Sequence, residues 1–113
     1  MRWLPVAAAL LLVACGGVDK EAYERSVRAI VAEAREAGRT PAAMRGAAAK
    51  LRALEPPEEV AGPHRDLTTA FGALADAGER GTEPPEDVID RLLAARRAFG
   101  ERRYDIGVYG PLS

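Results

Sequence analysis

Apolar residues recur along most of this chain at the three- and four-residue spacing of amphipathic helices. The first stripe of this kind falls within residues 20–37 and consists of Tyr23, Val27, Ile30, Ala34 and Ala37. Asp19 stands before it as a candidate N-cap, and Gly38 stands after it as a residue suited to end a helix. The pattern therefore predicts a first helix over residues 20–37.

A second helix is predicted to begin at Thr40-Pro41, because an N-cap hydroxyl followed by proline is a favoured helix start. Its apolar face runs to residue 54 and consists of Met44, Ala47, Leu51 and Leu54. Gly46 lies within this helix and indicates close packing against a neighbouring helix. Pro56-Pro57 ends the element, since the residue before a proline resists helical geometry.

A third stripe, within residues 58–78, is interrupted by Pro63. The stripe consists of Val60, His64, Leu67, Phe71, Leu74 and Gly78. Proline inside a helix removes a backbone hydrogen bond and forces a kink. Two outcomes are open: a short turn over residues 57–61 followed by a new helix start at Pro63, or one bent helix. Residues 78–82 are expected to form a loop.

A fourth helix is predicted over residues 85–103, with acidic residues in its first turn and arginines near its end, as the helix dipole favours. Its apolar face consists of Val88, Ile89, Leu92, Leu93, Ala95 and Phe99. The tail, residues 104–113, has no helical period. We expect it to be extended and to pack Tyr104, Ile106 and Tyr109 over an end or groove of the bundle.

Together these elements predict an all-α fold, a small up-down bundle of three or four antiparallel helices over residues 19–103, followed by an irregular C-terminal tail. A chain of 113 residues suits a single domain. Alanine inflates the hydrophobic share and aromatic residues make up only 5%. Because small side chains bury little area each, the core should be thin and the helices close together.

The N-terminal stretch differs from the helices because it is apolar without a polar face. Arg2 is followed by an uncharged segment, residues 4–14, and then by Cys15, the only cysteine of the chain. Such a segment has the length of the hydrophobic region of a signal peptide and is too short to span a bilayer comfortably. A disulfide within the chain is excluded because there is one cysteine.

Leu12-Val13-Ala14-Cys15 resembles the lipobox of bacterial lipoproteins, in which an aliphatic residue and two smaller residues precede the modified cysteine. The resemblance implies that residues 1–14 are a signal peptide that is removed, and that Cys15 then carries diacylglycerol and commonly a further acyl chain such as palmitate. Residues 15–18 would form a lipidated N-terminus with a very short tether. The alternative is an ordinary signal peptide or N-terminal anchor, with Cys15 as a free or buried thiol.

The same resemblance implies export and lipid anchoring to the cell membrane, or to the outer membrane if the organism has two membranes. The folded domain would face the periplasm or the cell exterior. The charge balance argues against nucleic acid as a partner, because 16 basic and 17 acidic residues give a net charge of −1. The absence of Asn and Gln is typical of a GC-rich genome and also fits a thermophile.

Side chains that could carry chemistry are few. His64 is the only histidine, and it shares a predicted helix face with Thr68 but has no orienting acid at helical spacing. The paired carboxylates Glu58-Glu59 and Glu86-Asp87 stand at predicted helix starts, where the helix dipole accounts for them. We therefore predict no catalytic residue, cofactor or metal site, and no enzyme. His64 has three interpretations: a hydrogen-bonded structural residue, a contact for a partner, or a metal or catalytic residue.

A second resemblance concerns residues 51–67. The run Leu51-Arg52-Ala53-Leu54-Glu55-Pro56-Pro57, followed by Val60, His64 and Leu67, is similar to a pattern in small helical lipoproteins of GC-rich bacteria. The sequence thus predicts a non-enzymatic envelope lipoprotein, an accessory or structural protein-interaction module. Its partners would be membrane lipid, through acylated Cys15, and an envelope protein. The alternative is a helical bundle that binds a small apolar ligand or a lipid in the periplasm or on the outer cell surface.

Overall fold

The computed structural model describes residues 18–107, and all regular structure within this range is helical. The α-helices are α2 (Lys20–Glu36), α3 (Pro41–Ala53), α4 (Ala61–Arg80) and α5 (Glu86–Glu101), and a 3-10 turn, η1 (Glu58–Val60), precedes α4. The predicted all-α bundle is thereby confirmed for this part of the chain. None of its helices combines the length and the apolar content needed to cross a bilayer.

Two of the predictions fall outside the described range. The lipobox with Cys15 belongs to residues 1–17, and Tyr109 belongs to residues 108–113. The lipidation of Cys15 and the packing of Tyr109 therefore stay predictions.

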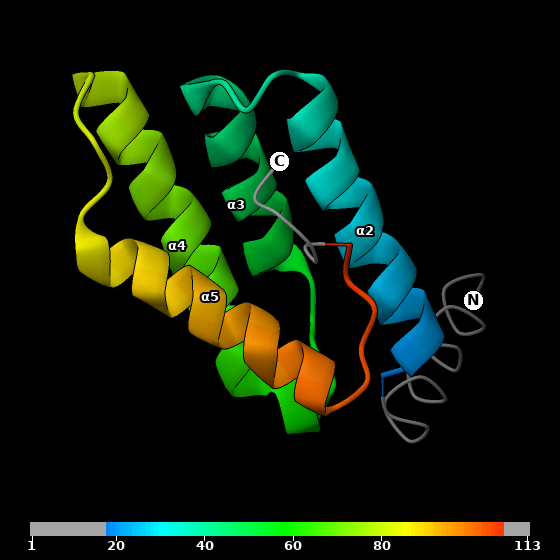
Figure 1. The fold of residues 1–113 in the computed structure, drawn as a ribbon. Coiled ribbons are helices and arrows are strands. Elements are labelled where there is room, and N and C mark those ends of the chain that lie inside the picture. Colours follow the sequence, from blue (N-terminus) through cyan, green and yellow to red (C-terminus); the bar gives the residue numbers. More distant parts are fainter. Residues whose placement is uncertain (1–17, 108–113) are drawn as a thin grey trace, which may run out of the picture.

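The helices form one layer with a fourth helix across it. α2, α3 and α4 lie side by side and alternate in direction, with α3 in the middle (Figure 1). α5 crosses this layer obliquely and packs on α4, and the chain then turns back to run along α2 (Figure 1). The first three helices have the predicted up-down arrangement. The oblique course of α5 could not be predicted, since an apolar stripe shows that a helix packs but not at what angle.

Helix boundaries follow the capping residues of the sequence. Thr40 is the N-cap of α3, and its Oγ1 accepts a hydrogen bond from the amide of Ala43 at 3.1 Å. Asp19 holds the N-cap position of α2, although its side chain makes no capping hydrogen bond. After α2, Gly38 adopts a φ of 79°, a left-handed conformation that glycine accepts without strain. Gly38 therefore ends α2 as predicted.

Pro63 does not bend a helix, because it lies in the first turn of one. η1 ends at Val60 and α4 begins at Ala61, so Pro63 is the third residue of α4. Amides in the first turn have no partner within the helix, and a proline there removes no hydrogen bond. The short turn followed by a new helix start is therefore the correct outcome, with the start two residues earlier than predicted. At its other end α4 continues to Arg80, so residues 78–80 are helical and not loop.

The predicted stripes identify most of the core but shift the buried faces of α2 and α5. Val31 is buried, whereas Ile30 is only half-buried and Ala37 is exposed. Leu93 was expected on the apolar face of the last helix and is 36% exposed. Successive residues lie about 100° apart around the axis of a helix. The rotation of α2 about its own axis therefore decides whether Ile30 or Val31 faces the core.

The prediction of close packing at Gly46 is wrong, and the close approach occurs at another glycine. Gly46 is exposed, and a Cβ added there would meet no atom within 4 Å. At Gly78 an added Cβ would lie 2.8 Å from Cγ of Pro41. Gly78 therefore allows α4 to approach the first residue of α3.

Candidate functional site

Among residues 18–107, the tyrosines apart, the most buried polar side chain is that of His64, in the first turns of α4. It is 6% exposed, and both ring nitrogens form hydrogen bonds to other helices. Nδ1 lies 2.7 Å from the hydroxyl of Tyr23 on α2, and Nε2 lies 2.8 Å from the carbonyl oxygen of Leu51 on α3. His64 thus connects three helices, and the prediction of a hydrogen-bonded structural histidine is confirmed.

The partners of His64 determine which nitrogen carries the proton. A carbonyl oxygen can only accept, so Nε2 carries the proton and donates it to Leu51. Nδ1 then accepts the proton of the Tyr23 hydroxyl. Burial lowers the pKa of His64, an effect that the Leu51 carbonyl partly opposes. The neutral ring is therefore the form that this site accommodates.

Thr68 shares the face of His64 but does not bond to its ring. Its hydroxyl donates to the backbone carbonyl of His64 at 2.8 Å, the back-bond that threonine often makes within a helix. His64 and Thr68 are close in the sequence, but their side chains therefore do not form a base–hydroxyl pair.

Three aromatic rings from three different segments surround this junction. Tyr23 lies with its ring centroid 6.3 Å from Phe99 of α5 and 6.0 Å from Tyr104, and the last two rings are 6.1 Å apart. These separations are typical of attractive aromatic pairs. The three rings are buried, at 0–1% exposure, so the partner of His64 on α2 lies in an aromatic part of the core.

Tyr104 extends the polar network toward the surface. Its hydroxyl donates to the carboxylate of Glu59 in η1, and Nζ of Lys20 lies 4.8 Å from its ring centroid. Burial and the neighbouring carboxylates, Glu59 first, raise the pKa of Tyr104 to about 12. Burial also raises the pKa of Tyr23, with a smaller contribution from Tyr104. Glu59 thus has a specific partner, which the sequence did not indicate.

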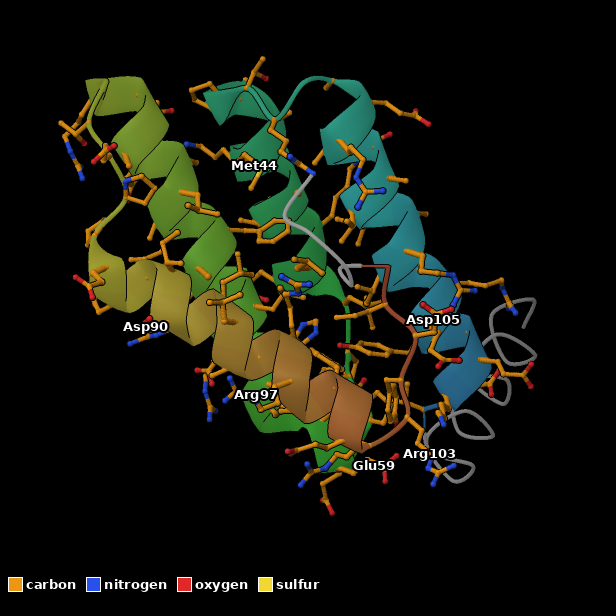
Figure 2. All side chains as sticks on the ribbon, viewed as in Figure 1. Met44, Glu59, Asp90, Arg97, Arg103 and Asp105 are labelled. Atoms are coloured by element: carbon orange, nitrogen blue, oxygen red, sulfur yellow. The ribbon has the colours of Figure 1, made fainter. Side chains whose placement is uncertain are left out.

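The segment that supplies Tyr104 is held along α2, and we call residues 104–107 the strap. Tyr104 and Ile106 are buried, as predicted for this part of the tail. Between them Asp105 lies beside α2 (Figure 2), where its amide donates to Glu24 at 2.8 Å and its carbonyl accepts from Arg28 at 2.8 Å. Further along, Arg35 donates to the Gly107 carbonyl at 3.1 Å. The side chains of α2 therefore bind the backbone of the strap.

Polar groups on the surface form a different kind of contact. Nη2 of Arg45 on α3 lies 2.6 Å from Asp76 and 2.7 Å from Glu79, both on α4, and all three side chains are about half exposed. These contacts raise the pKa of Arg45 and lower that of Asp76. Lys50 forms an ion pair with Glu33 between α3 and α2.

A hollow of about 170 Å³ lies between α2 and α3, beside the Lys50–Glu33 pair. It is lined by Ile30, Glu33, Ala34, Ala37, Ala43, Gly46, Ala47 and Lys50. Sites for small ligands usually have volumes of about 300–1,000 Å³. The hollow therefore offers little support for the apolar-ligand alternative.

Within residues 18–107 no group of three or more His, Cys, Asp or Glu side chains is arranged to hold a metal ion. The acidic pair Glu86-Asp87 occupies the first turn of α5, the position that the helix dipole favours. The buried bonds of His64 to Tyr23 and to the Leu51 carbonyl form a polar junction inside a core. By its fold and its site, the protein is a small helical bundle with a buried histidine–tyrosine junction.

Comparison with known proteins identifies no relative of this chain. No family model, curated protein or solved structure matches the chain.

The sequence contained a signal for this junction that periodicity alone does not use. A tyrosine in a buried stripe needs a hydrogen-bond partner for its hydroxyl. Tyr23 lies in such a stripe and the only histidine lies in another. Pairing the polar atoms of the predicted stripes would have made His64 a candidate partner for Tyr23.

Proposed function

We propose that the chain is a membrane-anchored envelope lipoprotein whose helical bundle serves as a non-enzymatic protein-interaction module. The observation that carries this proposal is the order Arg2, apolar residues 4–14 and Leu12-Val13-Ala14-Cys15. Charge, length, small residues and cysteine occur there in the order that lipoprotein processing requires.

The start of the folded part is compatible with anchoring at Cys15. Val18 already packs against the core, and α2 begins at Lys20. Gly16 and Gly17 separate Cys15 from Val18, which is three residue steps, and an extended chain spans about 3.3–3.6 Å per step. Lipidation at Cys15 would therefore hold the bundle within about 10 Å of the headgroups. Two or more acyl chains would make this anchoring firm, since each buried methylene contributes about 0.8 kcal/mol.

The interior of the bundle supports a role in contact and not in turnover. The ring nitrogens of His64 bond to Tyr23 and to the Leu51 carbonyl, and Glu59 accepts from Tyr104. Side chains bonded to one another in a core stabilise a particular shape, and such a shape presents a defined surface to a partner.

Metabolic labelling with a clickable fatty acid tests the lipidation. We expect label on the wild-type chain and none on Cys15→Ser, with the mature protein in the membrane fraction only for the wild type. A matched control is the double variant Cys15→Ser/Ser26→Cys, which keeps one thiol but has no lipobox. Label on this control or on Cys15→Ser would contradict the proposal, because it would show acylation independent of the motif.

The interaction role needs a separate measurement. Crosslinking in the native envelope, followed by mass spectrometry, should identify the same protein partner in repeated captures with the wild type. Cys15→Ser should capture much less of it, because the bundle is no longer held at the membrane. Equal capture by the wild type and Cys15→Ser would show that partner binding does not depend on anchoring. If no protein is crosslinked reproducibly, the interaction role is contradicted.

A further inference from the structure

His64 provides the buried polar connection between α2 and the rest of the bundle. Its Nδ1 bonds to the Tyr23 hydroxyl at 2.7 Å, and within residues 18–107 this hydroxyl has no other hydrogen-bond partner. The other side-chain hydrogen bonds of α2 in this range lie at exposed positions, on Glu24, Arg28, Glu33 and Arg35. α2 is also an edge helix of the layer and lies beside α3 (Figure 1).

Protonation of the ring would change one of its two bonds and keep the other. Nε2 would still donate to the Leu51 carbonyl, so the bond to α3 persists. Nδ1 would become a donor facing the Tyr23 hydroxyl, which is itself a donor in the neutral state. The Tyr23 oxygen would have to accept instead, and its own proton would lose its acceptor inside the core. An unpaired buried polar group is strongly unfavourable, so acidification weakens the bond between His64 and Tyr23 of α2.

The two groups that hydrogen-bond to the ring of His64 are neutral. They are the Leu51 carbonyl of α3 and the Tyr23 hydroxyl of α2, while Phe99 of α5 and Tyr104 of the strap lie against the ring of Tyr23. The nearby carboxylate of Glu59, in η1, accepts from Tyr104 and forms no hydrogen bond with the ring of His64. The charge that lies against the ring of Tyr104 is the ammonium group of Lys20, which cannot offset a positive charge on His64. Burial accordingly lowers the pKa of His64.

We propose that His64 is an acid-sensitive latch, whose protonation releases α2 from the bundle while α4 and α5 stay folded. The latch depends on contacts within residues 18–107 and operates whether or not Cys15 is lipidated. If Cys15 is lipidated, α2 is the first helix after the anchor in the sequence, and the latch then controls how rigidly the bundle is held at the membrane.

Hydrogen exchange of the full-length chain, measured as protection factors from pH 8 to pH 5, tests the latch. We expect protection of the α2 amides to fall about fivefold from pH 6.5 to pH 5.5, because the released form binds a proton that the closed form binds weakly. Amides of α4 and α5 should keep their protection over the same range. In His64→Gln, the side-chain amide can donate to Leu51 and accept from Tyr23 without titrating, so the α2 protection should not depend on pH.

Several results would overturn the proposal. These are constant α2 protection in the wild type, an equal fall in all helices, or the same fall in His64→Gln. If His64→Gln does not fold, NMR of the wild type decides, because the chain has a single histidine whose ring signals are directly assignable. The fall in α2 protection must then begin above the pH at which the ring titrates. A fall that begins only below about pH 4.5, where ordinary carboxylates titrate, would show that His64 is not the latch.

Discussion

On the surface of the bundle Arg45 of α3 bonds to Asp76 and Glu79 of α4, whereas inside it His64 of α4 bonds to Tyr23 of α2. We call the first group the outer cluster and the second the inner junction. The outer cluster is charged, about half exposed and surrounded by water that can replace each bond. The inner junction is neutral and buried, so no water replaces a bond that is lost there. Short ion pairs are therefore a poor guide to which contacts determine this fold.

The largest expected effect comes from removing an aromatic ring that packs against the inner junction. Phe99→Ala should lower the free energy of unfolding by about 3–5 kcal/mol, because the fully buried ring leaves a cavity between Tyr23 and Tyr104. Urea denaturation measures this loss. Leu93→Ala, on the exposed side of the same helix, is the control and should change stability by less than about 0.5 kcal/mol. Similar losses for both variants would contradict the assigned core.

Because of the inner junction and the neighbouring Tyr104, the stability of the folded protein should depend on pH both below and above neutrality. The folded pKa of His64 lies below its unfolded value near 6.5, so the unfolded chain binds more protons and stability falls as the pH drops below about 6.5. The pKa of Tyr104 is raised to about 12 and that of Tyr23 is raised as well, so stability also falls as the pH rises above about 10. Each pKa unit between the two states corresponds to about 1.4 kcal/mol.

Thermal unfolding monitored by circular dichroism between pH 5 and pH 11 measures both effects. In His64→Gln, the thermal stability should change less between pH 8 and pH 5, and its fall above about pH 10 should remain. A wild type whose stability is constant from pH 7 to pH 5 would contradict the buried neutral state of His64.

One substitution at two glycines distinguishes packed from open parts of the outer surface. Gly46→Ala should stabilise the chain by about 0.5–1 kcal/mol, because the new methyl meets nothing and glycine is unfavourable within a helix. At Gly78 the same methyl would lie 2.8 Å from the ring of Pro41, and the overpacking, about 1–3 kcal/mol, should exceed the gain. Urea denaturation of the two variants side by side measures the difference. Stabilisation by both would show that α3 and α4 are not in close contact there.

The smallest effect is expected in the outer cluster. Arg45→Ala should hardly move the unfolding midpoint at low salt, and in 1 M salt the variant and the wild type should coincide, because exposed charges are screened. Denaturation at the two salt concentrations measures this. A large loss that persists in high salt would mean that the outer cluster contributes as much as the inner junction.

The parts of the fold that could be predicted depend on interactions between residues close in sequence. The start of α3 was predictable because the Thr40 hydroxyl bonds an amide three residues away and Pro41 suits the first helical position. The burial of Tyr104 and Ile106 was predictable because a non-helical apolar tail must cover part of the core. The general role of His64 was predictable as well, since buried polar groups form hydrogen bonds.

The parts that could not be predicted depend on how the helices are rotated against one another. Tyr23 and His64 are 41 residues apart, and Tyr104 and Glu59 are 45 apart, so no local pattern pairs them. For Tyr23, the need of a buried hydroxyl for a partner makes His64 a candidate, but the contact itself depends on helix rotation. The same reason explains why the prediction for Gly46 is wrong, because which glycine faces a neighbour depends on helix rotation.

The strap has a consequence for the order of folding. Its contacts with α2 join residues up to 81 positions apart, as between Asp105 and Glu24, whereas the contacts of α4 with α3 and α5 join neighbours in the chain. A ribosome or an export channel delivers the chain from its N-terminus, so Tyr23 is delivered long before Tyr104 and Ile106. Contacts between distant residues form slowly, because long loops must close first. We therefore expect the apolar face of α2 to stay open during synthesis and to be the surface that folding helpers contact.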